Sequence, residues 1–352
     1  MSVEAQARFG PLRTVPPAPV VDAVNADGSP WRADRLGSHG PFPNGGMWRV
    51  LQPGNPGASA VVKRTGPAHL GGDPVWAGAI DSADPQWWGR EAVFYRSALA
   101  TDGWTDGSRA ARCLAIDDHD DVRDLWLEDV ADLPLPGSEY RRLVGALARW
   151  QVHHRGIDHP WLSHGWIAHH LRRRGLDNTR TLEDVRWSRL FEACIPPSVH
   201  DAVRHRLTDP TAIGRLVDEL TQLLTHYDFH HMNLGRVGDE IVIIDWATVG
   251  LGPVGHDVGL LVVDGATTVG EGLPEAWEQL ITTYAEELRD AGSVLAVAEV
   301  ERSVAISTVL RHGWVIDYVL ALSDELSPED LATSSPLLEH LAGLQSRLLP
   351  QG

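Results

Sequence analysis

Lysine is almost absent from this chain. Of its 352 residues, 30 are basic, and every one of these except Lys63 is an arginine. A codon bias towards arginine would explain this composition, and the position of Lys63 would then be accidental. The alternative is chemical, because a planar guanidinium cannot replace a compact ammonium group on a flexible stem. The choice depends on where Lys63 lies relative to the other candidate functional residues.

Cysteine is also scarce, and long basic clusters and long apolar runs are missing. Cys113 and Cys194 are the two cysteines and lie far apart, which excludes a disulfide framework and a CxxC metal site. The formal net charge is −18 and no arginine cluster is longer than Arg172–Arg174, so nucleic acid is not an expected partner. Residues 1–10 lack an apolar core, and no run approaches the ~18 apolar residues of a membrane span, so neither a signal peptide nor a membrane-spanning segment is expected. We therefore expect a soluble, cytoplasmic protein without a membrane partner, and the oligomeric state stays open.

The N-terminal third has the pattern of a β-rich domain with one helix. Proline and glycine are frequent up to residue 46, as is typical of loops. From Pro85 the apolar positions recur every three or four residues, which predicts a helix that begins there and includes Glu91. Strands are predicted at 47–51, 58–63, 112–116 and 124–130.

The rest of the chain has the pattern of a helical domain. Ser138 is a suitable N-cap for a helix whose apolar stripe includes Leu143 and Trp150. Two short strands at 236–245 are the one predicted β interruption. Together these patterns predict an α+β protein with domains at 1–130 and 131–352. Further helices are predicted at about 182–194, 197–206, 212–225, 274–291, 298–323 and 335–348.

The segment that points most clearly to chemistry is 226–233, which reads His-Tyr-Asp-Phe-His-His-Met-Asn and precedes a strand that ends in aspartate. Phosphoryl transfer from ATP needs a carboxylate that orients a hydroxyl nucleophile, and oxygen ligands for Mg²⁺. Asp228 can supply the carboxylate. Asn233 and Asp245 can supply the metal ligands.

Lys63 ends a predicted strand upstream of this segment. A lysine that contacts the α and β phosphates of ATP is expected at such a position, and Glu91 can hold its ammonium by an ion pair. Glycines before the strand could let the backbone approach phosphates, although their order is not a Gly-x-Gly-x-x-Gly fingerprint. These glycines are Gly37, Gly40, Gly45 and Gly46.

In order and type, these residues resemble the aminoglycoside phosphotransferase and choline kinase-like family over roughly residues 35–260. The resemblance implies a protein-kinase-like fold with two lobes: a β-rich N-lobe with an ATP cleft under it, and a mainly helical C-lobe that accepts the substrate. The residues that carry it are Lys63, Glu91, Leu127-Glu128-Asp129, His226-Tyr227-Asp228, Asn233 and Asp245-Trp246.

The resemblance also implies a role for each matching residue. Lys63 would bind the ATP phosphates with Glu91 as its partner. Asp228 would be the catalytic base, and Asn233 and Asp245 would be Mg²⁺ ligands. Further nucleotide-binding residues would be Gly45 and Gly46, together with Leu127, Glu128 and Asp129, whose backbone would meet adenine. Candidate acceptor-site residues are Tyr227, His230, Trp314 and Asp317.

One position departs from the family pattern. The family usually has glycine between the histidine and the aspartate of the catalytic loop, where this chain has Tyr227. Protein kinases have arginine there, so we expect that no positive φ is required and that the aromatic ring narrows the acceptor site. Asp257, further along the chain, is expected to make structural hydrogen bonds.

The implied function is Mg²⁺- and ATP-dependent phosphorylation of a hydroxyl group on a small molecule. An aminoglycoside or another natural-product antibiotic is the first choice of acceptor, and a sugar, a choline-like amino alcohol or a nucleoside is the alternative. A kinase-like scaffold that binds nucleotide without transferring phosphate is a second alternative. A third is a metallohydrolase with the ligands His226, Asp228, His230 and His231, but that function would leave Lys63 unexplained.

Overall fold

The structure is a computed structural model of the chain and divides into two compact units. The first consists of Met1–Pro134, Asp158–His164 and Met232–Val249, and the second of Leu135–Ile157, Gly165–His231 and Gly250–Gly352. The residues described are 15–36, 45–67, 79–119, 121–130, 135–173, 195–208, 215–269, 272–313, 315–316, 319 and 325–348. Outside them lie the predicted helix at 182–194 and Gly37, Gly40, Cys194, Trp314 and Asp317.

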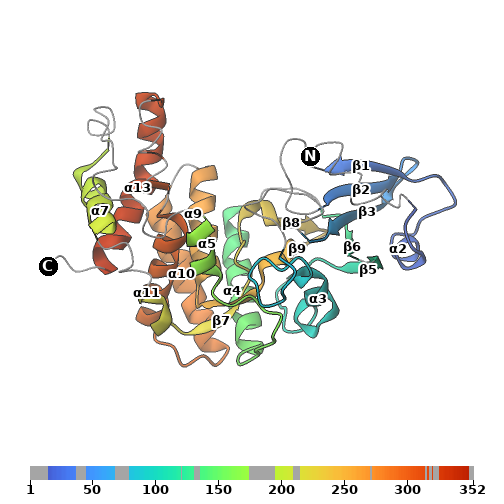
Figure 1. The fold of residues 1–352 in the computed structure, drawn as a ribbon, viewed down its shortest axis with the longest axis horizontal. Coiled ribbons are helices and arrows are strands. Elements are labelled where there is room, and N and C mark those ends of the chain that lie inside the picture. Colours follow the sequence, from blue (N-terminus) through green and yellow to red (C-terminus); the bar gives the residue numbers. More distant parts are fainter. Residues whose placement is uncertain are drawn as a thin grey trace. The chain divides into compact units, whose positions relative to one another are not determined.

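The first unit is built on a five-stranded antiparallel sheet with the order β1-β2-β3-β6-β5 (Figure 1). Its strands are β1 Arg32–Leu36, β2 Gly46–Gln52, β3 Asn55–Thr65, β5 Cys113–His119 and β6 Val122–Glu128. The helices of this unit are α2 Ala18–Ala23 and α3 Arg90–Arg96, with a 3-10 turn at Ala98–Ala100. The four predicted strands are confirmed, to within a few residues at their ends, as β2, β3, β5 and β6.

The alternation of side chains decides which face of this sheet carries Lys63. Val62 pairs with Trp126, and both belong to the apolar cluster on one face. Lys63 pairs with Leu125, which packs against Ala92 of α3 on the other face. Because successive residues of a strand point to opposite faces, Lys63 lies on the face that contacts α3.

Helix α3 begins at Arg90 and not at Pro85, so the predicted start is wrong. Residues 81–89 form turns, in which the side chains of Asp81 and Asp84 accept main-chain N–H bonds from two residues further on, at 3.0 and 2.8 Å. Such bonds compete with a helix for the same donors. The buried Arg90 guanidinium also donates to the main-chain oxygens of Asp84 and Pro85, both at 2.7 Å, which holds the turns in place.

A second, three-stranded sheet with the order β4-β9-β8 also belongs to the first unit. Its strands are β4 Ser108–Ala110, β8 Leu234–Val237 and β9 Glu240–Ile243. Strands β8 and β9 form the predicted hairpin, and β4 pairs with β9 in parallel. Gly238 at the hairpin turn has a φ of 59°, which glycine adopts at little cost.

The second unit is mainly helical (Figure 1). Its helices are α4 Gly137–His153, α5 Trp166–Arg173, α7 Pro197–Thr208, α9 His256–Val269, α10 Leu273–Asp290, α11 Val297–His312 and α13 Pro328–Leu348. A short antiparallel pair is formed by β7 Gln222–Thr225 and β10 Gly250–Pro253, and a 3-10 turn by Val217–Glu219. One apolar cluster joins α7 to α13, and a second joins α5 to α11 around Tyr227.

The strand β7 contradicts the helix that the sequence predicts at 212–225. Leu223, Leu224 and Thr225 are buried in this strand, which pairs with β10. The period of such a short apolar run does not distinguish a buried strand from a helix. The partner strand, which decides between them, lies further along the chain.

Two helix ends also differ from the predictions. Helix α11 ends at His312, before the predicted end at 323. Helix α13 begins at Pro328 and not at 335, because Ser327 forms a reciprocal cap: its hydroxyl accepts the N–H of Asp330 at 3.1 Å, and the Asp330 carboxylate accepts the N–H of Ser327 at 3.0 Å. The predicted α+β class, β-rich at the N-terminus and mainly helical at the C-terminus, is confirmed.

Candidate active site

A buried cluster of charges in the first unit surrounds the single lysine. The Nζ atom of Lys63 lies 2.6 Å from Oε2 of Glu91 and 2.6 Å from Oδ1 of Asp245. Strand β3 supplies Lys63, helix α3 supplies Glu91, and Asp245 follows β9. The ion pair predicted between Lys63 and Glu91 is therefore present, and Asp245 joins it.

Burial and charge act in opposite directions in this cluster. The side chains of Lys63 and Glu91 are 4% and 1% exposed, whereas that of Asp245 is 37% exposed. Burial alone would lower the pKa of Lys63, but the carboxylates of Asp245 and Glu91 outweigh burial and raise it. Burial raises the pKa of Glu91, and the Lys63 ammonium opposes this effect. One ammonium between two carboxylates leaves excess negative charge, which an additional cation at the more exposed Asp245 would neutralise.

Asp245 is held in position by the contacts of its neighbour in the chain, Trp246. Asp245 has the left-handed conformation, with φ 62° and ψ 65°, which aspartate tolerates better than most residues. The main-chain N–H of Trp246 donates to Oε1 of Glu91 at 3.3 Å, and the Trp246 ring stacks on Phe94 with ring centroids 4.2 Å apart. Helix α3 therefore positions both carboxylates around Lys63. The 3-10 turn Trp246–Thr248 follows directly.

Asn233 and Asp245 lie at the same end of the β8–β9 hairpin. Leu234 pairs with Ile243, and the main-chain N–H of Ile244 donates to the main-chain oxygen of Asn233 at 3.0 Å. Amide and carboxylate oxygens are ligands of Mg²⁺, and a Mg²⁺ ion that also binds nucleotide phosphates needs only one or two protein ligands. The donor set of this hairpin end therefore fits Mg²⁺.

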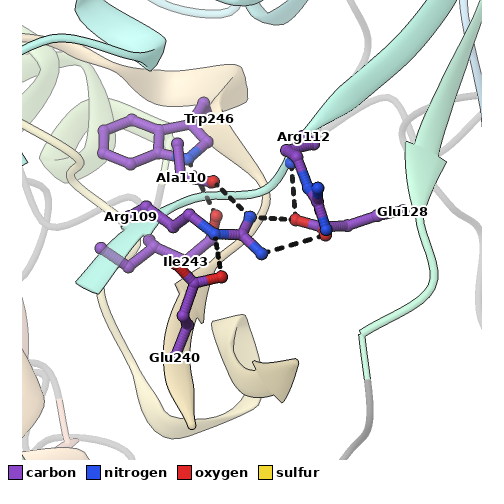
Figure 2. A network of polar contacts seen from close by, with 7 residues as sticks. All are labelled: Arg109, Ala110, Arg112, Glu128, Glu240, Ile243 and Trp246. Atoms are coloured by element: carbon purple, nitrogen blue, oxygen red, sulfur yellow. Dashed lines mark hydrogen bonds and ion pairs between the residues drawn. The ribbon is translucent and has the colours of Figure 1, made fainter. Parts of the chain in front are cut away.

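A network of arginines and carboxylates holds the end of β6 (Figure 2). Arg109 of β4 donates two hydrogen bonds to the Glu128 carboxylate and one, at 2.8 Å, to Glu240 of β9. Arg112 donates to the same carboxylate from its main-chain N–H, at 2.7 Å, and from Nε, at 3.0 Å. Burial alone would raise the pKa of Glu128, but both arginines outweigh burial and lower it. The network thus ties the end of β6 to the sheet that carries the hairpin.

The side chains of the predicted adenine-binding segment therefore serve the fold. Leu127 is buried, and Glu128 belongs to the network just described. The Asp129 carboxylate accepts hydrogen bonds from Nε of Arg49, at 3.0 Å, and from the hydroxyl of Ser59. These contacts determine the course of the segment, and the contact of its backbone with adenine stays a prediction.

Gly46 begins β2 with a φ of 122°, in the region that favours glycine. A Cβ atom at this position would lie 2.8 Å from the ring of Trp48, so the start of the strand requires glycine for its own geometry. The predicted contact of Gly45 and Gly46 with phosphates stays a prediction.

In the second unit, Asp257 holds the loop that contains Asp228. The two carboxylate oxygens of Asp257 accept the main-chain N–H groups of His226, at 2.8 Å, and Tyr227, at 2.9 Å. Asp257 lies in the first turn of α9 and is buried. Burial raises its pKa to about 7, although the two N–H bonds oppose this shift. The predicted structural role of Asp257 is confirmed.

The Asp228 carboxylate lies between a histidine and an arginine. Its Oδ2 atom is 3.4 Å from Nε2 of His230, and its Oδ1 atom is 3.6 Å from Nη2 of Arg311. Burial alone would raise the pKa of Asp228, but His230, Arg311 and His226 outweigh burial and lower it to about 2. Asp228 is thus ionised at neutral pH, with its side chain about one third exposed. Nothing in the sequence pattern identified Arg311, which comes from the last turn of α11.

Tyr227 contradicts the expectation that the loop needs no positive φ, because its φ is 68°. Its ring is buried and stacks on Trp166 with centroids 5.0 Å apart, and its hydroxyl donates to the main-chain oxygen of Leu251 at 2.6 Å. A Cβ atom on Gly252 would lie 2.5 Å from that hydroxyl. Tyr227 is therefore a core residue of the second unit, and its position does not support the predicted contact with an acceptor.

The other histidines of the loop have partners of their own. His231 donates its main-chain N–H to Asp264 at 3.0 Å, and its ring contacts the same carboxylate. In the part of the chain that the structure describes, no group of three or more His, Cys, Asp or Glu side chains could hold a metal ion. The metallohydrolase alternative therefore has no ligand set among these residues.

The sequence pattern of the phosphotransferase enzyme family (APH) matches residues 85–292, which is more than half of the chain. The chain belongs to this family. The predicted family and the predicted enzyme class, a phosphotransferase that acts on hydroxyl groups of small molecules, are thereby confirmed. Membership implies ATP as the phosphoryl donor.

Solved structures similar to this phosphotransferase include a choline kinase from Cryptosporidium parvum Iowa II. That structure is 12% identical, covers 90% of this chain and 88% of its own, and has a TM-score of 0.50, which supports the kinase-like fold. A choline/ethanolamine kinase family protein from Mesorhizobium loti is 16% identical over 98% of both chains, with a TM-score of 0.48. An amicoumacin kinase in complex with AMP-PNP, Ca²⁺ and Ami is 13% identical over 90% of this chain and 87% of its own, also with a TM-score of 0.48.

No curated protein sequence matches the phosphotransferase chain. Among its described helices, none combines the length and the apolar character that crossing a membrane requires.

Proposed function

We propose that this phosphotransferase transfers the γ-phosphate of ATP, with Mg²⁺, to a hydroxyl group of a natural-product antibiotic, with an aminoglycoside as the first candidate. One observation carries the proposal. The only lysine of the chain is buried with its ammonium 2.6 Å from both Glu91 and Asp245. The formal net charge of −18 favours a cationic acceptor, because a negative field attracts amines.

In the first unit, Lys63 stabilises the negative charge of the ATP phosphates in the transition state. Glu91 keeps the ammonium in a defined position, and Trp246 keeps Glu91 in place through its N–H. Such preorganised charge is a major source of rate enhancement in phosphoryl transfer. Asn233 and Asp245 would hold Mg²⁺, which would neutralise charge on the phosphates.

In the second unit, Asp228 orients the hydroxyl group of the acceptor. A carboxylate with a pKa of about 2 is a weak base, so it accepts a hydrogen bond from the hydroxyl and receives the proton only as the bond to phosphorus forms. Asp257 holds the loop through two main-chain N–H bonds. Orientation of the nucleophile is therefore the main contribution of this loop.

The proposal is tested with purified protein, MgATP and a panel of possible acceptors. The panel contains aminoglycosides, other hydroxylated antibiotics, sugars, amino alcohols including choline, and nucleosides. ADP release measures turnover, and mass spectrometry of the product locates the added phosphate. Turnover of an antibiotic is the expected result. Rapid turnover of a sugar, choline or a nucleoside without turnover of any antibiotic would refute the antibiotic acceptor and favour a kinase of primary metabolism.

The variant Asp228→Asn separates catalysis from nucleotide binding. It is expected to reduce kcat by about 10³-fold, because it removes the acceptor of the hydroxyl proton, while ATP still binds. Asp290→Asn, at a side chain that is 73% exposed, is the matched control and should retain the wild-type rate. If the Asp228→Asn protein turned over its substrate like the wild type, the catalytic role of Asp228 would be wrong. If the wild-type protein bound ATP but turned over no acceptor, the kinase-like scaffold without phosphate transfer would be favoured.

A further inference from the structure

Arg311 makes three contacts around the loop of Asp228. Its Nη2 atom lies 3.6 Å from Oδ1 of Asp228, and its Nη1 atom lies 2.9 Å from Nε2 of His170. Its guanidinium carbon lies 5.1 Å from the centre of the Trp166 ring. The side chain is 13% exposed. A planar guanidinium suits this position, because it can stack on an aromatic ring and direct its N–H groups to two different partners.

The partners of Arg311 also hold one another. Trp166 stacks on His170, with ring centroids 4.8 Å apart, and on Tyr227, with centroids 5.0 Å apart. Tyr227 immediately precedes Asp228 and has a φ of 68°. The left-handed conformation is unfavourable for a residue other than glycine, so the loop keeps it only where its surroundings support it. The stack of His170, Trp166 and Tyr227 provides that support, and Arg311 connects the stack to the carboxylate.

The two oxygens of Asp228 have different neighbours. His230 is within reach of Oδ2, and Arg311 is near Oδ1. A distance of 3.6 Å is too long for a hydrogen bond, so Arg311 acts on Oδ1 through its charge. A carboxylate oxygen has two lone pairs, and Oδ1 can still accept a hydrogen bond from a hydroxyl group while the guanidinium keeps the carboxylate ionised.

Other titratable groups surround the same carboxylate. His226 and His230 belong to its own loop, and His256 and Asp257 begin α9. Burial lowers the pKa of His256 to about 3, with the Arg311 charge acting in the same direction, so His256 is neutral near pH 7. His170 of α5 and His312 of α11 lie around Arg311, and burial also lowers the pKa of His312. The residues that lower the pKa of Asp228 are His230, Arg311 and His226. The guanidinium of Arg311 keeps its positive charge at every pH of an enzyme assay.

We propose that Arg311 is a positioning residue for phosphoryl transfer: held by Trp166 and His170, its guanidinium lies 3.6 Å from Oδ1 and keeps the Asp228 carboxylate oriented towards the acceptor hydroxyl. This inference rests on the proposed role of Asp228 and extends it. It also accounts for Tyr227 at the position where the family usually has glycine, because the tyrosine ring is one layer of the stack.

The test compares Arg311→Gln, Arg311→Lys and the control Arg302→Gln. Arg302 lies on the same helix, α11, where its side chain is 47% exposed and lies 3.8 Å from Glu219. With MgATP and an acceptor from the panel above, Arg311→Gln should lower kcat by about 10- to 100-fold and leave the KM for ATP unchanged. Arg311→Lys should recover part of this loss, because it restores the charge, and Arg302→Gln should have the wild-type kcat.

A second measurement reads the contact between Arg311 and Asp228 without turnover. In protein labelled with ¹³C in its aspartate carboxyl groups, the resonance that is missing in Asp228→Asn belongs to Asp228, and its titration gives the pKa directly. Arg311→Gln should raise this pKa, and Arg302→Gln should leave it unchanged. A role limited to folding would lower the thermal stability of Arg311→Gln without this shift.

The outcomes separate the inference from the proposed function. If Asp228→Asn loses turnover but folded Arg311→Gln keeps the wild-type kcat and the same pKa of Asp228, the inference is wrong and the proposed function stands. If Asp228→Asn has the wild-type rate, the proposed function itself fails. If Arg311→Gln does not fold, Arg311→Lys carries the test, because an ammonium cannot hold the geometry of the guanidinium; a wild-type kcat in that variant would overturn the proposal.

Discussion

Lys63→Arg tests most directly why this chain retains one lysine. The substitution keeps the charge and replaces lysine by the basic residue found at every other basic position of the chain. The Lys63 side chain, however, is 4% exposed, and its Nζ atom lies 2.6 Å from two carboxylates. A guanidinium is larger and planar, so it cannot occupy the same point between Glu91 and Asp245 without moving one of them.

Two costs follow from this geometry. Overpacking of a buried position costs about 1–3 kcal/mol in the free energy of unfolding. Displacement of a preorganised charge from the phosphates should lower kcat by about 10²–10³-fold, which corresponds to about 3–4 kcal/mol in the activation free energy. Since the carboxylates raise the pKa of Lys63, the ammonium is protonated throughout the assay range, and the loss should not depend on pH.

The assay is ADP release at saturating acceptor, combined with urea denaturation of each variant. Arg32→Lys is the matched control, because it makes the reverse exchange on β1 at a side chain that is 61% exposed; it should change stability by less than about 0.5 kcal/mol and leave kcat unaltered. Lys63→Met should lose about 3–5 kcal/mol of stability, because Glu91 is then buried without its counter-ion. A folded Lys63→Arg protein with wild-type kcat and KM for ATP would refute the reasoning and make the single lysine an accident of codon usage.

Three further predictions concern the catalytic loop. Asp257→Ala leaves two buried main-chain N–H groups without an acceptor and should lower the free energy of unfolding by about 2–5 kcal/mol. The control Asp290→Ala, at an exposed site, should leave it unchanged. Equal stability of the two variants in urea would contradict the role of Asp257. Gly252→Ala places a Cβ atom 2.5 Å from the hydroxyl of Tyr227 and should lower the free energy of unfolding by about 1–3 kcal/mol. The loss should be smaller in a Tyr227→Gly background, and strict additivity of the two substitutions in a double-mutant cycle would contradict the clash. Because the folded pKa of Asp228 is lowered from 3.8 to about 2, the contribution of its carboxylate to stability is present above pH 3.8 and lost as the pH falls towards 2. The value of kcat should therefore not fall between pH 7 and pH 4 through protonation of Asp228. A fall of kcat in this range that is absent in Asp228→Asn would refute the lowered pKa.

Much of the fold was predictable because its signals are local. The hairpin strands around residue 63, the helix that carries Glu91 and the β8–β9 hairpin all have a period or a turn residue that can be read within a short window. Errors occurred where a distant partner decides the local structure. The start of α3 depends on Arg90, whose guanidinium binds the preceding turns, and the strand at 222–225 depends on β10.

The candidate site divides in the same way. Lys63, Glu91, Asp228, Asn233 and Asp245 could be proposed as site residues, because phosphoryl transfer needs groups of these types and their order resembles that of the family. The residues that hold them in place could not be identified. Arg109 acts on Glu128 and Arg311 acts on Asp228 across large distances in the chain, and an arginine on a strand or at a helix end has no local signature.

The sequence by itself therefore determined which groups are candidates for the chemistry: a single lysine at a strand end, a glutamate on the following helix, and an aspartate, an asparagine and a second aspartate further along the chain. Only the tertiary structure decided how these groups are held. It placed Lys63 on the face of the sheet that contacts α3, where both carboxylates reach 2.6 Å. It also gave Tyr227 a positive φ and paired Asp228 with Arg311. The physical reason is that charge and hydrogen-bonding capacity belong to residue types, whereas burial, partners and backbone strain depend on packing between distant segments.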